Sequence, residues 1–227
     1  VFKRGLLPVP LHFSESFLKL PFLSLWDKIG VGRAFLAIML EHSSRKDLDD
    51  ISMLDWLKEK GQTPNAIERF WRQVLVSAIN EELDRMAASH GFQVFRLGFL
   101  ATNDSYEMGV PNVPLGDLYG SAAWGKMPNV RLRLRAPVEK VIVDGGRVAG
   151  IVSGGETHVA RQYVSAVPFE RIGALIPEAG VDTSAFSHSS ITSVHVWFDR
   201  PVTELDNATL LERNIQWFFN KEGGRYL

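Results

Sequence analysis

One amphipathic pattern constrains this chain more than any other feature, and it covers the eighteen residues TPNAIERFWRQVLVSAIN from Thr63 to Asn80. Apolar side chains recur at helical spacing along it, at Ile67, Phe70, Trp71, Val74, Leu75, Ala78 and Ile79. Thr63 is a suitable N-cap, and Pro64 fits the first helical position, where its missing N–H breaks no hydrogen bond. The pattern predicts a helix over residues 63–80 with one buried face.

Two adjacent aromatic residues on that face, Phe70 and Trp71, are open to two interpretations. Aromatic side chains at helical spacing usually pack in a core. Alternatively, these two line a long apolar cavity, where an aromatic face also stabilises positive charge. Asn80 either caps the end of the helix or points inward as one of the few polar groups of an apolar pocket. Phe70, Trp71 and Asn80 are therefore the candidate substrate-binding residues.

The composition excludes several functional classes. The 25 Lys and Arg residues balance 26 Asp and Glu residues, so the net charge of −1 argues against nucleic acid as a partner. The chain has no cysteine, which excludes disulfides and thiolate chemistry and favours a cytoplasmic location. The beginning lacks a signal-peptide layout, and the apolar run from Ala34 to Leu40 is too short to cross a bilayer. Because the chain starts at Val1 and stops at KEGGRYL, we expect a piece of a longer protein.

The order of periodic segments predicts an α+β fold. Further helices are expected over residues 52–60, 82–98 and 115–127, with Ser52 as the cap of the first and Gly61 as its end. From Asn129 the pattern alternates, and it predicts a three-stranded antiparallel meander that runs out through Val143, back through Val152 and out again to Ala166. The stretches ITSVHVWFDRP and NIQWFFN are also typical of strands.

Searches for motifs of known chemistry are mostly negative. Gly30-Val31-Gly32 resembles the start of a dinucleotide fingerprint, but position 35 is Phe35 and no strand precedes it, so we interpret these residues as glycines at the entry of a helix. The six histidines form no HExxH or HxxxH pair, so no metal site is predicted. His195 fits a half-buried strand histidine better than a catalytic one, and no GxSxG nucleophile motif occurs.

Several segments resemble one family of flavoenzymes. The segments are SMLDWLKEKGQTPNAIERFWRQVLVSAINEE, VPLGDLYG, RAPVEKVIVDGGRVAGIV leading to YVSAVP, and VHVWFDRPV. They are similar in sequence and order to segments of the squalene-associated FAD-dependent desaturases, or hydroxysqualene dehydroxylases. That group lies within the flavin-containing amine oxidase and phytoene desaturase superfamily. The resemblance covers most of the chain, from about Leu11 to Phe219.

The resemblance implies a central part of a two-domain flavoprotein that uses FAD. Residues 1–113 would form a mainly helical substrate-binding region, residues 114–175 a helix and meander of the FAD domain, and residues 176–227 the start of a substrate-domain sheet. By position, Val138 corresponds to the residue whose backbone meets the adenine of the flavin, and this role is compatible with an ordinary inward strand valine. Ala166, Val167 and Pro168 correspond to the end of the meander near the cofactor. The phosphate-binding motif of the family does not occur in these residues, and no acid or base is transferred.

The reaction implied by the resemblance replaces the hydroxyl of hydroxysqualene with hydride from reduced flavin and gives squalene. Such a reaction needs protonation of a poor leaving group and a dry cavity that stabilises carbocation character. Because the substrate is a hydrophobic isoprenoid, the Leu-, Phe- and Pro-rich stretch from Leu6 to Trp26 is expected to border a membrane-facing mouth, with peripheral membrane contact. Amine or carotenoid oxidation in the same superfamily, and a non-catalytic lipid-binding module, remain the alternatives.

Overall fold

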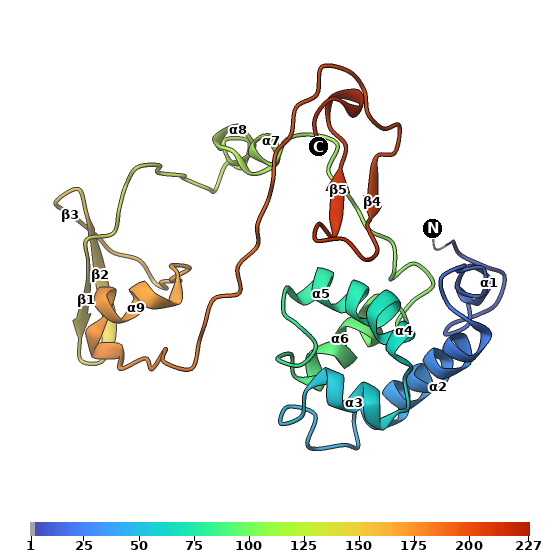
Figure 1. Ribbon diagram of the computed structural model, residues 1–227. Coiled ribbons are helices and arrows are strands. Elements are labelled where there is room, and N and C mark those ends of the chain that lie inside the picture. Colours follow the sequence, from blue (N-terminus) through green and yellow to red (C-terminus); the bar gives the residue numbers. More distant parts are fainter. Residues whose placement is uncertain (1–2) are drawn as a thin grey trace. The chain divides into compact units, whose positions relative to one another are not determined.

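The computed structural model describes residues 3–227 and contains both helices and strands, which confirms the α+β prediction (Figure 1). The helices of the first half are α1 (Ser14–Leu18), α2 (Leu25–Glu41), α3 (Met53–Glu59), α4 (Pro64–Ala66), η1 (Ile67–Arg72), α5 (Gln73–Ile79) and α6 (Ala88–Gly98). Further along lie α7 (Leu115–Tyr119), α8 (Ser121–Trp124), α9 (Phe169–Leu175) and the short 3₁₀ turns η2 (Pro177–Ala179) and η3 (Glu222–Gly224). The strands are β1 (Lys140–Asp144), β2 (Arg147–Ser153), β3 (Glu156–His158), β4 (Asn207–Thr209) and β5 (Trp217–Phe219).

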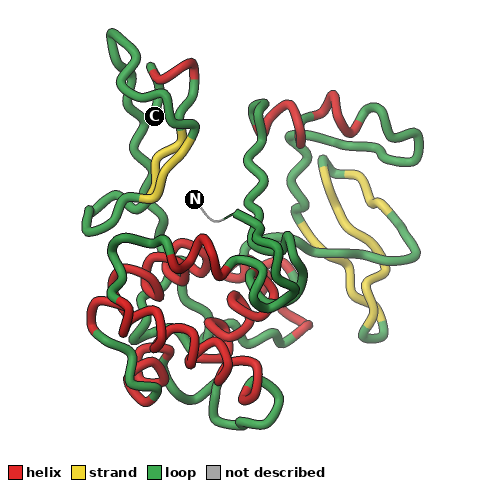
Figure 2. The backbone as a smooth tube through the Cα atoms, turned by 90° about the vertical axis from the view of Figure 1, so that its right-hand side faces the viewer, coloured by secondary structure: helices red, strands yellow, loops and turns green. Residues whose placement is uncertain are grey.

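Contacts between Cα atoms divide the chain into two compact units. The first combines the residues up to Met108 with residues 189–227, and the second is formed by residues 109–188. Figure 2 shows the helices of the first half gathered together, while the strands form two separate small sheets. The boundaries at 113/114 and 175/176 that the sequence suggests remain predictions.

The helical part of the first unit encloses a core rich in aromatic rings. Its buried side chains include Phe35, Trp56, Phe70, Trp71 and Phe95. The ring centroids of Trp71 and Phe95 are 4.7 Å apart and those of Phe35 and Phe95 are 5.3 Å apart, which are typical distances for stacked or edge-to-face rings. The rings of this core come from four different segments, α2, α3, the η1 helix and α6, so the core itself holds the helices together.

The helix expected over residues 63–80 forms, but its middle differs from an α-helix. Thr63 accepts a hydrogen bond from the backbone N–H of Ala66 at 3.1 Å, Pro64 occupies the first turn, and Asn80 ends the helix with a φ of 61°, so both predicted ends are confirmed. Between them, η1 is a π-helix. A π-helix has more residues per turn than an α-helix, and such insertions are frequent at functional sites.

The beginnings of α2 and α4 meet at one buried carboxylate, Asp27. The side chain of Ser24 caps α2 and accepts from the N–H of Asp27, while Asp27 accepts from the N–H of Ser24 in return. Asp27 also accepts from the Thr63 hydroxyl, and from the amide Nδ2 of Asn65 at 2.7 Å. Burial alone would raise the pKa of Asp27, but the hydrogen bonds from Thr63, Asn65 and Ser24 outweigh it and lower the pKa to about 2. One carboxylate therefore stabilises two helix starts.

Two helix predictions were wrong in part. Residues 82–87 are not helical, because Ala87 forms an isolated bridge with Ser52 and the carbonyl of Met86 accepts from the N–H of Met53 at 2.8 Å. The segment 115–127 breaks at Gly120, whose backbone is extended; a Cβ there would lie 2.1 Å from the carbonyl oxygen of Gly116. By contrast, the prediction for residues 52–60 is confirmed: Ser52 caps α3, and Gly61 follows its end with a φ of 65°.

The glycine pair Gly30 and Gly32 lies inside α2 and not at its entry, because Ser24 starts the helix one and a half turns earlier. The carbonyl of Gly30 accepts from the side-chain amide of Gln62 at 2.9 Å. These glycines therefore belong to a continuous helix, which is not the strand-turn-helix geometry of a phosphate loop.

The meander is confirmed as a three-stranded antiparallel sheet of order β1-β2-β3. Val141 pairs with Ile151, and Ile151 pairs with His158. Its extent is smaller than the sequence pattern suggests, because residues 130–138 form no strand and Arg135 has a positive φ of 54°. The third strand ends at His158 and does not reach Ala166.

The last segment contains less strand than expected. NIQWFFN supplies β5, which pairs with β4 in register Ala208 to Phe218. The segment ITSVHVWFDRP forms no strand of a sheet. Its Trp197 makes an isolated β-bridge with Tyr226. Within residues 3–227, no helix has both the length and the apolar character needed to cross a membrane.

Candidate functional site

The aromatic pair of the π-helix points into the closed core. Trp71 is fully buried and Phe70 is almost so, and their ring centroids lie 5.4 Å apart. The indole N–H of Trp71 donates to Oε1 of Gln62 at 2.8 Å, and Nε2 of Gln62 donates to the carbonyl of Gly30. A buried amide thus joins the π-helix to α2. Core packing accounts for both rings, and their contact with a substrate stays a prediction.

Two neighbouring residues of η1 both face inward. Such neighbours occur in the regular helices as well, since Trp56 and Leu57 in α3 are both fully buried. In η1, Phe70 and Trp71 are both buried, whereas Glu68, Arg69 and Arg72 remain partly open to solvent. The same irregular turn therefore supplies a core wall on one side and a charged surface on the other.

Asn80 caps the helix and ties it to the last segment of the chain. Its left-handed backbone ends α5, and its Nδ2 donates to the carbonyls of Ser189 at 3.1 Å and Ser190 at 3.2 Å. The capping interpretation is confirmed. A polar role of Asn80 in an apolar pocket stays a prediction.

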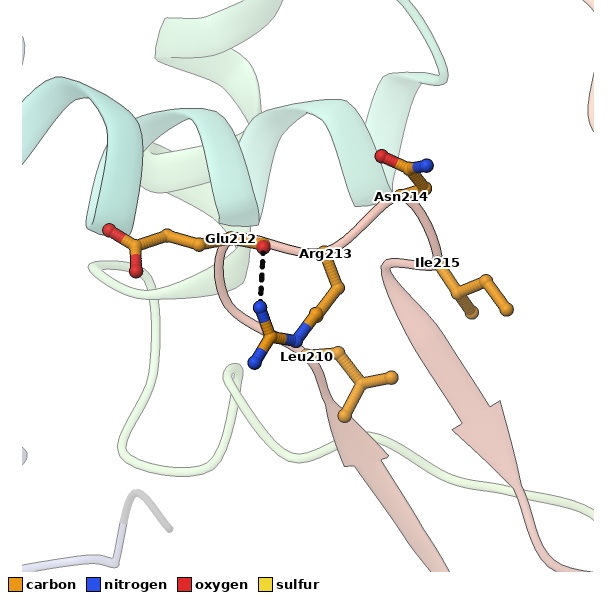
Figure 3. Close-up of a pocket in the computed structure, with 5 residues that line it drawn as sticks. All are labelled: Leu210, Glu212, Arg213, Asn214 and Ile215. Carbon is orange, nitrogen blue, oxygen red and sulfur yellow. Dashed lines mark hydrogen bonds between the residues drawn. The ribbon is translucent and has the colours of Figure 1, made fainter.

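A polar cleft lies over the charged side of the π-helix. It has a volume of about 470 Å³ and is lined by Glu68, Arg72, Gln73 and Glu82 from the helical side and by Glu212, Arg213, Asn214 and Gln216 from the connection between β4 and β5. A second hollow of about 530 Å³ shares Glu212, Arg213 and Asn214 with it and adds Leu210 and Ile215 (Figure 3). Phe70 and Trp71 line neither space.

Ion pairs organise this cleft. Arg72 donates from Nε and Nη2 to the two oxygens of Glu82, at 2.9 and 2.5 Å, which is a bidentate pair. Arg69 donates from Nε and Nη2 to Oε1 of Glu212 at 2.9 and 2.6 Å. Hydrogen bonding to Glu82 raises the pKa of Arg72 above its usual value, which outweighs the effect of burial. The guanidinium of Arg213 reaches the backbone carbonyl of Glu212, as Figure 3 shows.

The chemistry of the cleft is that of polar recognition. Its lining consists of carboxylates, guanidinium groups and amides, which do not match a long hydrocarbon. Within residues 3–227, the buried Nε2 of Gln73 has no hydrogen-bond partner. The sequence pattern places Arg72 and Gln73 on the polar face of the helix, but it contains no signal that Glu212 lies beside them. Sequence reasoning therefore missed this cleft.

The residues expected near a flavin lie in the meander unit. Val138 is partly exposed and precedes β1; the next N–H, that of Glu139, donates to the carbonyl of Val152 at 2.8 Å. Ala166, Val167 and Pro168 lead into α9, and Pro168 stands at its N-cap. Tyr163 anchors this exit, since its hydroxyl donates to the carbonyl of Ala149 in β2 at 3.2 Å.

The family of the chain follows from its sequence along nearly its whole length. The model of the flavin-containing amine oxidoreductase family matches residues 2–226. The chain belongs to this family. The family as a whole uses a flavin cofactor, in general FAD, and has oxidoreductase activity.

One curated protein to which the chain is similar is the zeta-carotene desaturase, chloroplastic/chromoplastic, of Zea mays. The two are 29% identical over 151 residues, which are 61% of this chain and 23% of the relative. The chain thus spans about a quarter of the length of the curated relative that it matches. No solved structure matches the chain significantly.

Two of the residues expected near a flavin have accessible side chains. Val138 and Val167 are apolar and partly exposed, as contact with a planar ring would require. The pyrophosphate of FAD needs a glycine-rich turn at a helix start, and Gly30 and Gly32 cannot supply it because they lie in the interior of α2. Val138, Ala166, Val167 and Pro168 stay predictions of cofactor contact.

The surroundings of two histidines, His12 and His195, differ, and neither lies in a cluster of metal ligands within the described residues. Residues 3–227 contain no cluster of three or more His, Asp or Glu side chains that could hold a metal ion. His195 lies beside Tyr226, with a hydrogen bond between Nδ1 and the hydroxyl. His12 is fully buried, and neither ring nitrogen has a hydrogen-bond partner in the described part of the chain. Burial, with a contribution from Arg4, lowers the pKa of His12, so the neutral form is favoured.

Proposed function

We propose that this chain is part of an FAD-dependent oxidoreductase that acts on a long isoprenoid. The observation that carries the proposal is the family match over residues 2–226, joined to the alignment with a relative that is named for a carotenoid substrate. A closed aromatic core in one unit and a three-stranded meander in the other support it, because a hydrocarbon substrate needs rigid apolar walls and a cofactor held in a fixed place.

The specific reaction that we favour is reductive dehydroxylation of hydroxysqualene to squalene, a step toward hopanoids or sterols. The support is the resemblance of the segment 52–82 and of VHVWFDRPV to hydroxysqualene dehydroxylases. When bound, FAD supplies the hydride. In this proposal the residues of the chain position and shield: Phe70 and Trp71 form the wall of the helical region, Asn80 holds its last turn, and Val138 with Ala166, Val167 and Pro168 contacts the cofactor.

A second candidate function is carotenoid desaturation. It is favoured by the curated relative, whose printed name is that of a zeta-carotene desaturase. Desaturation removes hydrogen from the substrate and so requires oxidised flavin at the start, whereas dehydroxylation requires reduced flavin. The oxidation state that supports turnover therefore separates the two candidates.

The test is a pair of assays on the complete protein that carries this chain, supplied with FAD. In one, hydroxysqualene and reduced flavin are incubated with the enzyme, and squalene is measured by mass spectrometry. In the other, zeta-carotene and oxidised flavin are used, and the longer conjugated product is followed by its absorbance. Squalene formation supports the first candidate, and a coloured product supports the second. Tight binding of the isoprenoid with turnover in neither assay would contradict both and indicate a non-catalytic lipid-binding module.

A further inference from the structure

The helix α2 carries large apolar side chains on both of its sides. The inner side packs in the core through Val31, Ala34, Phe35 and Ile38. The opposite side is exposed, and we call it the outer face of α2: Leu25, Trp26, Ile29, Leu36, Met39 and Leu40. Leu25, Ile29, Leu36 and Leu40 follow one another at spacings of four, seven and four residues, which places them on one stripe. A helix that is apolar all round normally has a partner on each side.

The exposure of this outer face is large. Trp26 is 75% exposed, Leu40 66% and Leu25 65%. Contiguous apolar patches of this kind are uncommon on folded proteins and mark surfaces that contact a protein or a membrane. Leu18, at the end of α1, is exposed as well, and its carbonyl accepts from Nζ of Lys28 at 2.7 Å.

Cations outnumber carboxylates in the part of the chain that carries the outer face; Lys28 and Arg33 lie on α2 itself, whereas Lys19 is paired with Glu15. Between residues 3 and 41 the chain has five cations, Lys3, Arg4, Lys19, Lys28 and Arg33, and three carboxylates, Glu15, Asp27 and Glu41. Two of the carboxylates are directed to internal partners: Asp27 is buried at the helix junction, and Glu41 bonds to Trp56, Lys60 and Arg45. Within the described residues, Arg33 is paired with no carboxylate.

Apolar side chains between basic ones match one kind of occupant better than a protein partner. A helix that lies in a membrane interface buries its apolar residues among the acyl chains, while Lys and Arg meet anionic headgroups and Trp lies at the boundary. Trp26 lies at the start of α2 and Arg33 at its middle, so an aromatic and a basic residue accompany the apolar residues of the outer face. We propose that the outer face of α2 docks on an anionic lipid surface.

This inference does not depend on which reaction the enzyme performs, and it relocates the expected membrane contact. The sequence predicts that contact in the stretch from Leu6 to Trp26, which includes Phe17 and Phe22. Phe17 is buried in the core and Phe22 is partly buried against it, so replacing them would damage the fold. The exposed residues of α2 provide a cleaner test.

The experiment is sedimentation of the purified 227-residue chain with vesicles of phosphatidylcholine alone or with phosphatidylglycerol. We expect binding to the anionic vesicles, and a loss of at least about tenfold for the triple variant Trp26→Ser, Leu36→Ser, Leu40→Ser. The single variant Arg33→Glu should weaken binding by about tenfold at low salt and by less at high salt, because salt screens the headgroup charge.

A matched control removes three exposed apolar side chains elsewhere, through Val159→Ser, Val164→Ser and Ile191→Ser, whose positions are 77%, 94% and 76% exposed. It should bind as the parent chain does. Far-UV circular dichroism confirms that each variant is folded, and Arg33→Glu tests the proposal even where the triple variant is not. Equal binding of parent and both α2 variants would overturn the proposal. The proposal would also be overturned if the parent chain bound no vesicles and formed a dimer in sedimentation velocity that the triple variant does not form. A second copy would then cover the face.

Discussion

The helical region from Phe13 to Phe95 and the meander from Lys140 to His158 are stabilised in different ways. Among the described residues, the buried apolar side chains all lie in the helical region except Val141 in β1. The meander instead shows paired backbones and two tight turns, Gly145-Gly146 and Gly154-Gly155, in which every φ is positive. Such two-residue turns match the twist of antiparallel strands. The helical region is therefore held by its interior, and the meander by its ladder and turns.

This difference indicates what each region needs from its surroundings. A small sheet is stable when one face packs against something apolar. Val159, Val164 and Val167 near the end of the meander are exposed in the chain as described. The helical region has a closed interior and should keep its fold independently of what binds to the meander. The following predictions test this contrast.

The largest effect is expected for Trp71→Ala. Trp71 is fully buried, contacts Phe95 and Phe35, and donates to Gln62, so its removal leaves a large cavity and an unpaired amide. We expect a loss of about 3–5 kcal/mol in the free energy of unfolding, measured by chemical denaturation. Trp26→Ala, at an exposed position of the same region, is the control and should change stability by less than about 0.5 kcal/mol.

The same variant tests the alternative role of Trp71. If the ring contacts substrate and contributes little to packing, Trp71→Ala in the complete enzyme would lower turnover with little change in the melting temperature. In the meander, Val141→Ala should cost only about 1–2 kcal/mol, since it removes two buried methyl groups. An equal loss at Val141 and Trp71 would contradict the contrast between the two regions.

The next effect is expected at the carboxylate that joins α2 to α4. Asp27→Asn keeps the shape of the side chain but replaces a charged acceptor of several hydrogen bonds with an amide, and it should cost about 1.5–3 kcal/mol. Because the folded-state pKa of Asp27 is lowered to about 2, its contribution is complete above about pH 4 and is lost as the pH falls toward 2.

Denaturation curves between pH 2 and pH 7 measure that contribution. The parent chain should lose stability over the acid range more steeply than Asp27→Asn, whose residue 27 does not titrate. If the free energy of unfolding of Asp27→Asn fell with pH as steeply as that of the parent, Asp27 would not be the group whose protonation destabilises the fold. Asp117→Asn in α7, a helix without buried residues, serves as the control and should change the free energy of unfolding at pH 7 by less than about 0.5 kcal/mol.

How much of this could be predicted from the sequence depends on the distance between interacting residues. Thr63, Pro64 and Asn80 define the ends of their helix through contacts within four residues, and both ends were predicted. The π-helix was not, because it depends on fitting Phe70 and Trp71 against rings from α2 and α6. The hairpin turns were predictable from the glycine pairs alone.

Errors arose where distant residues decide the structure. Residues 82–87 have helical composition, but the backbone of Met86 and Ala87 pairs with that of Ser52 and Met53 more than thirty residues earlier. The polar cleft was missed for the same reason, since Glu212 is 143 residues from the Arg69 side chain that it binds. Candidate residues taken from a family resemblance, such as Val138, depend on a cofactor that the sequence pattern alone does not position.

A smaller effect with a change of sign is expected at two helix glycines of the helical region. A Cβ at Gly91 in α6 would lie 2.5 Å from Sδ of the fully buried Met53, whereas a Cβ at Gly32 in α2 would meet no atom within 4 Å. Gly91→Ala should therefore destabilise by about 1–3 kcal/mol through overpacking. Gly32→Ala should stabilise by about 0.5–1 kcal/mol, because alanine favours the helix. Thermal melting of both variants checks the pair, and stabilisation by Gly91→Ala would mean that the core is loose there.

An effect confined to one region is expected in the turns of the meander. Gly146 has a φ of 75° in the turn between β1 and β2, a conformation that costs alanine roughly 1–2 kcal/mol. Gly146→Ala should therefore speed amide hydrogen exchange in β1 and β2 by about five- to thirtyfold, while exchange in α2 and α6 stays unchanged. Gly173→Ala in α9 is the matched control, because its Cβ would meet no atom within 4 Å and the position is helical. Faster exchange in α2 and α6 as well would show that the two regions unfold together, and the contrast drawn between a packed interior and a ladder with turns would then not hold.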